Sequence, residues 1–214
     1  MKKQNYQIYA LITIFFWSMA FIFTRMTLPY FSASSLGFLR YLIASAALIV
    51  IVLVTKMKPP QLKDCPLFLL SGAIGFFLYM ITFNQGLVSV PAATASVVNA
   101  TVPAVTALIA GVVYKEKIRK VQWIAILIEL VGVAVLTVMS GGLSAGKGLL
   151  WMFGAALSLS TYNILQRKLT QTYTALQAST FSIFFGTLLL AIFALRSSAP
   201  IRSKSSSRST GFTM

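Results

Sequence analysis

Two charged residues lie in the middle of long apolar segments of this 214-residue chain. Glu129 follows Ile-Ala-Ile-Leu-Ile and precedes Leu-Val-Gly-Val-Ala-Val-Leu, and Arg40 lies between Leu-Gly-Phe-Leu and Tyr-Leu-Ile-Ala. A charge at bilayer depth costs on the order of several kcal/mol, so such residues usually face a cavity between helices and mark a substrate or ion path. The pair therefore predicts a route for a solute through a membrane.

Each of these charges has a functional and a structural interpretation. The guanidinium of Arg40 offers several fixed donors to a carboxylate or phosphate group, or it could bond backbone carbonyls of another helix. Burial disfavours the charged form of a carboxyl group, so Glu129 could accept a proton in coupled transport. It could equally be a neutral side chain that is bonded to a neighbouring helix. The residues alone leave both alternatives open.

Deep aromatic residues form a second candidate group. Trp17, Phe21 and Phe83 lie well inside apolar segments, where they could line a site for amphipathic solutes. Trp123 and Trp151 lie near the ends of such segments and are better explained as anchors at the membrane interface. The prediction is an aromatic binding site near the middle of the membrane.

The segment after residue 91 combines small residues with a proline. Ala92, Ser96 and Ala100 recur at a spacing of four, which lets another helix approach closely. Asn99 and Pro103 lie on a neighbouring face, and Pro103 removes a backbone hydrogen bond and kinks the helix. We expect these two residues either to pack tightly or to line the same cavity as Asn84 and Arg40.

The composition excludes several classes of protein. Of the residues, 57% are hydrophobic and 10% are charged, with mean hydropathy +0.84, whereas a soluble domain has about 25% charged residues. One cysteine, Cys65, and no histidine leave no internal disulfide and weaken any metal or haem site. No phosphate-binding glycine motif and no catalytic pair or triad is present, so we expect no cofactor and no enzyme.

Seven apolar segments have the length of membrane-spanning helices, and they are too continuous for barrel strands. We therefore predict an all-α polytopic bundle. The predicted spans are Tyr6 to Thr24, Phe31 to Thr55, Pro66 to Leu87, Ala92 to Tyr114, Val121 to Ser140, Gly148 to Gln166 and Tyr173 to Leu195.

Most of the cations lie in connections that fall on one side of this bundle. The net charge of +15 is therefore not a nucleic-acid footprint, which would need a basic soluble domain. Cytoplasmic loops retain positive charge, so the N-terminus is predicted to be cytoplasmic. Glu116 lies among these cations, where we expect a structural ion pair. The cations are Lys2, Lys3, Lys56, Lys58, Lys63, Lys115, Lys117, Arg119, Lys120, Arg167 and Lys168, against Arg25 and Lys147 on the other side.

A weak internal repeat appears at an offset of 142 residues. An offset of five spans inverts the second copy in the membrane, as in many secondary transporters. The pairs are Ser18 with Ser160, Ile22 with Ile164, Arg25 with Arg167, Phe31 with Tyr173, Ala33 with Ala175 and Leu48 with Leu190.

Several segments resemble the EamA-like family of the drug/metabolite transporter superfamily. They are Trp17-Ser-Met-Ala-Phe21, Leu39-Arg-Tyr-Leu-Ile-Ala44, Phe83-Asn-Gln-Gly-Leu87, Ala92-Ala-Thr-Ala-Ser96 with Pro103, and Tyr114-Lys-Glu116. The resemblance implies ten helices in two inverted halves. It places one five-helix half at residues 1–140 and two helices of the other at 141–195. Residues 196–214 form a Ser-rich basic tail, which we expect to be disordered and non-native after a truncation.

Together these features predict a gradient-driven transporter of small organic metabolites or drugs in the plasma membrane, with the lipid bilayer as its solvent. The expected substrate-binding residues are Trp17, Phe21, Arg40, Phe83, Asn84, Asn99 and Pro103, with Glu129 for proton coupling and Glu116 in a structural role. The alternative is a non-transporting scaffold, or a half-transporter that needs a partner chain such as a second copy in a homodimer.

Overall fold

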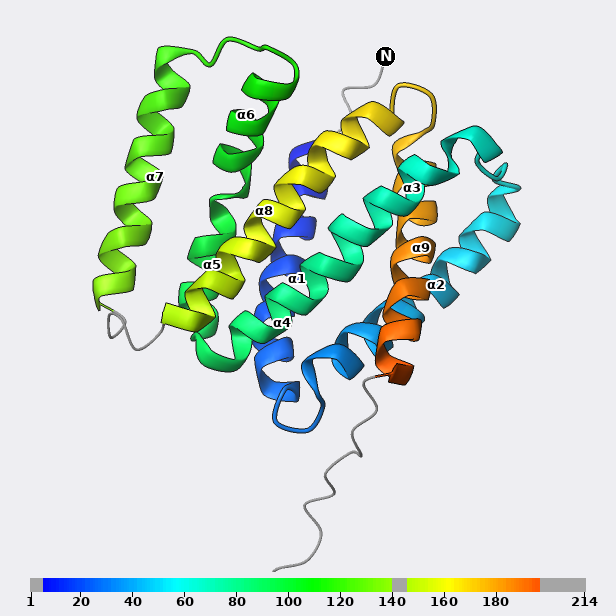
Figure 1. Cartoon of the computed structure of the whole chain (residues 1–214), viewed down its shortest axis with the longest axis horizontal. Helices are drawn as coiled ribbons and strands as arrows, with labels where there is room; N and C mark the ends of the chain where they lie inside the picture. Colours follow the sequence, from blue (N-terminus) through cyan, green and yellow to red (C-terminus); the bar gives the residue numbers. More distant parts are fainter. Residues whose placement is uncertain (1–5, 140–145, 197–214) are drawn as a thin grey trace, which may run out of the picture.

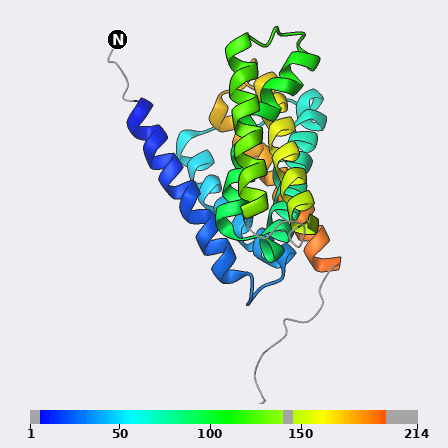
Figure 2. The same cartoon turned by 90° about the vertical axis from the view of Figure 1, so that its left-hand side faces the viewer.

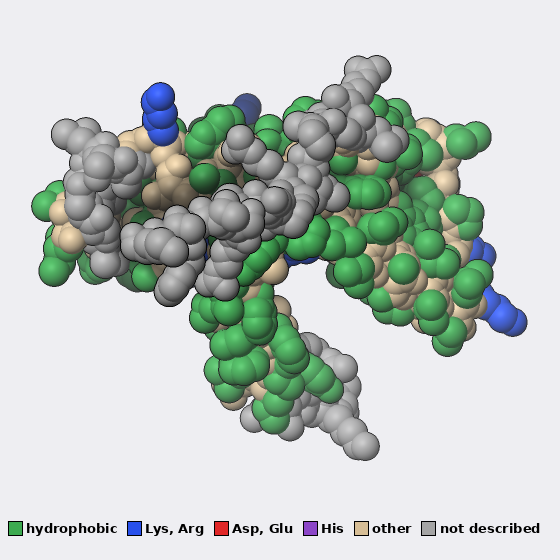
Figure 3. Space-filling view, turned by 90° about the horizontal axis from the view of Figure 1, so that it is seen from below, with side chains coloured by type: hydrophobic (Ala, Val, Ile, Leu, Met, Phe, Trp, Pro, Cys, Tyr) green, Lys and Arg blue, Asp and Glu red, His purple; other side chains and the backbone are tan. Residues whose placement is uncertain are grey.

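The computed structural model describes residues 6–139 and 146–196, and within these ranges the chain forms helices and no strands. The expected disordered tail at 196–214 lies outside the described residues except for Arg196, which ends the last helix. The predicted all-α bundle is confirmed. Hydrophobic side chains cover most of the described surface on the face in Figure 3, with Lys and Arg at only a few points.

The helices agree with the predicted spans to within a few residues at each end. Six segments are long and apolar enough to cross a membrane by length and composition: 7–27, 33–55, 62–89, 92–113, 146–169 and 175–194. The seventh predicted span is α7, Lys120–Met139, which is 20 residues long. The other elements are α1 (Tyr6–Thr27), α2 (Ala33–Thr55), η1 (Leu62–Asp64), α3 (Cys65–Gly72), η2 (Ala73–Leu78), α4 (Tyr79–Ser89), α5 (Ala92–Ala100), α6 (Val102–Val113), α8 (Gly146–Leu169) and α9 (Ala175–Arg196).

Helices α4 and α8 run side by side through the centre of the molecule (Figure 1). Beside them α9 packs on both α2 and α3, while α5 and α6 flank α8 on the other side. The N-terminal part of α1 lies apart from the other helices (Figure 2), and most of its described side chains are exposed. The bundle is therefore dense around α4 and α8 and open along α1 and α7.

The internal repeat is visible in the hydrogen bonds of two turns. Ser32 Oγ accepts from the backbone N–H of Ser35 at 3.1 Å and caps α2. At the offset of 142, Thr174 Oγ1 accepts from the N–H of Gln177 at 3.2 Å and caps α9. The backbone bonds that close these turns also recur at this offset: residue 31 to 27 and 36 to 32 in the first turn match 173 to 169 and 178 to 174 in the second. The first two helices of each half therefore fold alike.

One hydrogen bond locates the axis that relates the two halves. The hydroxyls of Ser45 on α2 and Thr187 on α9 lie 2.9 Å apart in the buried interior, and the two residues are separated by 142 positions. A residue that contacts its own equivalent lies on the two-fold axis of a symmetric arrangement. The pseudo-two-fold axis that the predicted inverted repeat requires would therefore pass between α2 and α9 at this pair.

The third span contains a π-helical stretch, Ala73–Leu78, that packs against α8 and α9. Gly75 lies here directly against the ring of Tyr162, and a Cβ atom at Gly75 would come within 2.1 Å of that ring. The absence of a side chain at residue 75 is what allows the two helices to approach.

The substitution Gly75→Ala is expected to destabilise the bundle by about 1–3 kcal/mol, because the added methyl group forces Tyr162 out of its position. Thermal unfolding in detergent, followed by circular dichroism, measures the effect. Gly132 on α7 is the matched control, because a Cβ atom there meets nothing within 4 Å. Gly132→Ala is expected to be neutral or to stabilise by about 0.5–1 kcal/mol. Equal effects of the two substitutions would contradict the packing role of Gly75.

Candidate functional site

A large cavity lies between α1, α5, α6 and α8, with a volume of about 630 Å³. This volume is within the range of small-molecule sites. We call it the central cavity. It brings together four residues that the sequence analysis expected to bind substrate: Trp17, Phe21, Asn99 and Pro103. Its lining residues are Ile14, Trp17, Ser18, Phe21, Ser96, Asn99, Ala100, Val102, Pro103 and Asn163.

The helix of the fourth span is interrupted at the wall of this cavity. Helix α5 ends at Ala100, Thr101 makes a tighter turn with φ −70° and ψ −9°, and α6 begins at Val102. Pro103 follows directly and has no N–H to continue the ladder of hydrogen bonds. The hydroxyl of Ser160 on α8 donates to the Val102 carbonyl at 3.1 Å. The predicted kink therefore takes the form of a one-residue interruption of the span at Thr101, next to a hydrogen bond from the neighbouring helix α8.

The polar groups of the central cavity carry no charge. Asn99 is only 6% exposed, and its Oδ1 is buried without a hydrogen-bond partner. The Asn163 amide donates to Thr106 Oγ1 at 3.4 Å, and the Ser18 hydroxyl donates back to the Ile14 carbonyl at 2.9 Å. An apolar wall with amide groups beside it suits an uncharged or amphipathic solute.

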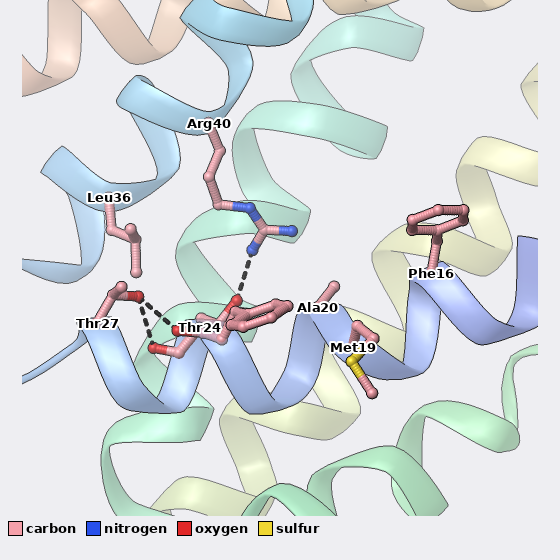
Figure 4. Close-up of a pocket in the computed structure, with 8 residues that line it drawn as sticks. Phe16, Met19, Ala20, Thr24, Thr27, Leu36 and Arg40 are labelled. Atoms are coloured by element: carbon pink, nitrogen blue, oxygen red, sulfur yellow. Dashed lines mark hydrogen bonds between the residues drawn. The ribbon is translucent and has the colours of Figure 1, made fainter.

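Arg40 lies in a different cavity, between α1 and α2. Its Nη1 donates to Thr24 Oγ1 at 2.8 Å, so the guanidinium points across to α1 (Figure 4). The cavity has a volume of about 360 Å³. It is lined by Phe16, Met19, Ala20, Phe23, Thr24, Thr27, Leu36 and Arg40. The structure therefore does not bring Arg40 to the central cavity, and its role in substrate binding stays a prediction.

Phe83 and Asn84 are core residues of α4. The Phe83 ring lies edge-on to Phe21 at 5.1 Å and stacks on Tyr79 at 5.4 Å between ring centroids. The Asn84 side chain is fully buried, and its Nδ2 donates to the Ala33 carbonyl at 2.7 Å. Phe83 supports the cavity wall from behind, and Asn84 ties α4 to the start of α2.

Glu129 is half-buried on α7, where Ile126 and Val133 are the buried residues among those whose burial the structure describes. It lines neither the central cavity nor the cavity of Arg40. Helix α7 contacts α5. Proton coupling through Glu129 therefore stays a prediction that is separate from the binding site.

Glu116 forms an ion pair with Arg167 on α8, and this is the one ion pair among the described residues. Arg167 Nη2 lies 2.6 Å from Glu116 Oε1, and the guanidinium lies 4.6 Å from the centroid of the Tyr114 ring. The bond from Arg167 holds the pKa of the Glu116 carboxyl below its usual value. The nearby lysines of the same loop are not its partners among the described residues.

The stabilising effect of this ion pair depends on pH in a definite direction. The pKa of Glu116 is lowered in the folded state, so its contribution is fully present above the ordinary glutamate pKa of about 4.3 and is lost as the pH falls through the folded value. Glu116→Gln is therefore expected to lower the unfolding temperature slightly near neutral pH and not at all in acid below the folded-state pKa. Thermal unfolding of both proteins at several pH values tests this, and a difference that persists in acid would contradict it.

Three polar residues of the central cavity, Ser18, Ser96 and Asn163, were not predicted as site residues, and two of them, Ser18 and Asn163, lie on the repeated helices α1 and α8. Ser18 did appear in the repeat, as the equivalent of Ser160. Asn163 is the equivalent of Phe21 at the offset of 142 and lines the same cavity. The repeat was therefore the signal that could have identified both, because equivalent positions of an inverted repeat meet at the same site near the midplane.

Comparison with known proteins gives a consistent set of matches. The sequence profile of the EamA-like transporter family matches residues 4–138. The uncharacterized transporter YdfC of Bacillus subtilis (strain 168) is 32% identical over 196 residues, which cover 90% of this chain and 64% of the relative. The uncharacterized transporter YyaM of the same organism is 27% identical over 209 residues, 94% of this chain and 68% of the relative.

A third relative carries a more specific name. The probable terminal-alkyne amino-acid exporter of Streptantibioticus cattleyicolor is 29% identical over 189 residues, which cover 88% of this chain and 64% of that protein. The chain thus spans just under two thirds of the length of the YdfC transporter and of this exporter. No solved structure matches the chain at a significant level.

Proposed function

Because the chain belongs to the EamA-like transporter family, we propose that it is a gradient-driven transporter whose solute binds in the central cavity. The observation that carries this proposal is the helix break at Thr101 beside Asn99 and Pro103. Interrupted helices at the membrane midplane expose backbone and side-chain polar groups to a substrate while neighbouring helices shield them from lipid. The relatives are named as transporters, and we extend the activity of a whole transporter to this chain.

The proposed substrates are small amphipathic organic molecules, with amino-acid-like solutes as the first class to test. One relative is named as an exporter of an unusual amino acid. In the central cavity Trp17 and Phe21 would contact the apolar part of such a solute, and the amide of Asn99 would bond its polar part.

The proposed location is the plasma membrane with the N-terminus in the cytoplasm. The basic connections 56–61 and 114–119 lie at one end of the bundle, together with the end of α8, which carries Arg167 and Lys168, and the turns at 28–32 and 89–91 lie at the other end (Figure 1). Positive charge is retained in the cytoplasm, which supports placing the basic end there. We call these ends the basic face and the turn face.

Trp17→Ala is expected to reduce the affinity for a transported solute about fivefold, since the solute loses an aromatic surface worth about 1 kcal/mol. Uptake of labelled amino acids into vesicles containing the protein measures transport. In a Trp123→Phe, Trp151→Phe background, solute binding is measured directly by the fluorescence of Trp17. Asn99→Leu is expected to weaken binding as well, because it removes the amide.

Trp123 is the matched control for Trp17, because 48% and 46% of their side chains are exposed and Trp123 lies on α7 away from the cavity. Trp123→Ala should leave binding and transport unchanged. Equal losses for the two tryptophan variants would contradict the proposed site. Binding without transport would favour the half-transporter described next.

A half-transporter that needs a partner chain is the second candidate, and one observation favours it. The repeat equivalents of Thr24 and Arg40 are Gln166 and Ser182, and both bond the Ser71 hydroxyl of α3, at 3.3 and 3.0 Å. The groove on α8 and α9 is therefore filled by a helix. The equivalent groove at Arg40 holds a cavity of about 360 Å³ instead.

Glu129→Gln tests the proposed proton coupling. The amide keeps the size of the side chain but cannot exchange a proton, so coupled transport is expected to lose its pH dependence. Vesicle uptake is measured with and without an imposed pH gradient. Leu130→Gln is a control that adds an amide to the same helix. Transport that keeps its full pH dependence in Glu129→Gln would exclude this residue as the coupling group.

A further inference from the structure

We propose that Arg25 and Arg167 are two latches at opposite ends of the central cavity, and that release of each latch opens the cavity toward a different face of the membrane. This inference deepens the proposed function and rests on it, because a latch matters only if the central cavity binds a solute. It concerns two residues that the binding site itself does not use.

The two arginines occupy equivalent places in the inverted repeat. They are separated by 142 residues, like Phe21 and Asn163, which both line the central cavity. Each arginine follows its cavity residue by four positions, which is about one helical turn. Helices α1 and α8 run in opposite directions, so one arginine lies toward the turn face and the other toward the basic face (Figure 1).

Arg25 ties the end of α1 to the connection between α4 and α5. Its Nη1 donates to the carbonyl of Leu87 and also to that of Val90, the latter at 3.4 Å. Leu87 lies in the last turn of α4, where carbonyls have no partner within the helix and carry a partial negative charge. The cation therefore ties the turn-face end of α1 to the chain just before α5.

Arg167 ties the end of α8 to the connection between α6 and α7. It pairs with Glu116 at 2.6 Å and lies over the ring of Tyr114, whose hydroxyl donates to the Ile164 carbonyl at 3.3 Å. Lys115 between them has a positive φ of 55°, so the backbone turns and presents both neighbours to α8. This contact closes the basic-face end of the space between α6 and α8.

The two latches act on the two ends of one broken helix. Arg25 binds just before α5 begins at Ala92, and Arg167 binds just after α6 ends at Val113. The break at Thr101 separates the two halves, and terminal residues of helices absorb the backbone changes of a hinge. One half can therefore move away from its partner helix while the other half stays attached.

Accessibility of the central cavity to a reagent tests the proposal without any substrate. In a Cys65→Ser background the chain has no other thiol, and Ser18→Cys then places one in the cavity. A membrane-impermeant, charged methanethiosulfonate is applied from each face of vesicles. Pro29→Cys and Lys115→Cys proteins report which face the reagent reaches.

Arg25→Gln is expected to raise labelling of the thiol introduced by Ser18→Cys about tenfold from the turn face alone, because it removes charge-assisted hydrogen bonds. Arg167→Gln is expected to raise it about two- to fivefold from the basic face alone, because an exposed ion pair is weaker. The matched controls Lys147→Gln and Arg119→Gln remove a cation at the turn face and the basic face respectively, and should change nothing. The exchange of Arg167→Glu with Glu116→Arg should restore the original labelling.

The proposal would be contradicted if labelling rises from both faces in one variant, or if it changes in neither Arg25→Gln nor Arg167→Gln. Two controls distinguish opening of the cavity from unfolding of the protein. A variant that only opens keeps its unfolding temperature, and the double variant Arg167→Glu, Glu116→Arg regains the original labelling, which an unfolded protein would not do. Failure of the proposed function is distinguishable, since solute binding to Trp17 can be absent while face-specific labelling persists.

Discussion

The requirement that lipid leaves no backbone polar group unpaired governs this structure. Continuous helices satisfy it by themselves, and most of the chain consists of them. The departures lie inside the bundle. The π-helical stretch at 73–78 packs against α8 and α9, and the break at Thr101 lies beside Ser160, which bonds the Val102 carbonyl. Each irregular stretch thus lies against a neighbouring helix. The interruption at Thr101 borders the central cavity, whereas the π-helical stretch does not line it.

The inverted repeat gives this arrangement its second organising constraint. Equivalent turns carry the same caps, and the Ser45–Thr187 pair lies on the axis between them. Residues at equivalent positions of the repeat therefore occupy related places, because the same caps and turns position their helices. Phe21 and Asn163 both reach the central cavity, although one is aromatic and the other is an amide. The two equivalent residues thus share a location in the structure, while their side chains differ in chemical type.

Much of the fold could be predicted from the sequence, because the length and hydropathy of a membrane helix are local properties. The spans agreed to within a few residues, and Pro103 marked the break. The kink takes the form of a one-residue interruption at Thr101, and the bond from Ser160 beside it had no local signal, because Ser160 is more than fifty residues away in the sequence. The π-helical stretch had no local signal, because it depends on the fit of Gly75 against Tyr162.

The candidate site was less predictable, because it depends on which helix faces meet. Trp17, Phe21, Asn99 and Pro103 line one cavity, whereas Phe83 packs behind its wall and Arg40 turns toward α1. Depth in an apolar segment identified residues that avoid lipid. It could not distinguish a residue that faces a cavity from one that faces a neighbouring helix.

The position of the Ser45–Thr187 bond has a mechanical consequence. In an inverted-repeat transporter the two halves exchange conformations when the binding site changes sides. A bond between two equivalent residues on the axis is the same before and after that exchange. Its energy therefore favours neither state. If this chain alternates as proposed, the hydroxyl pair would act as a neutral pivot, which holds α2 and α9 at a fixed spacing while the outer helices move.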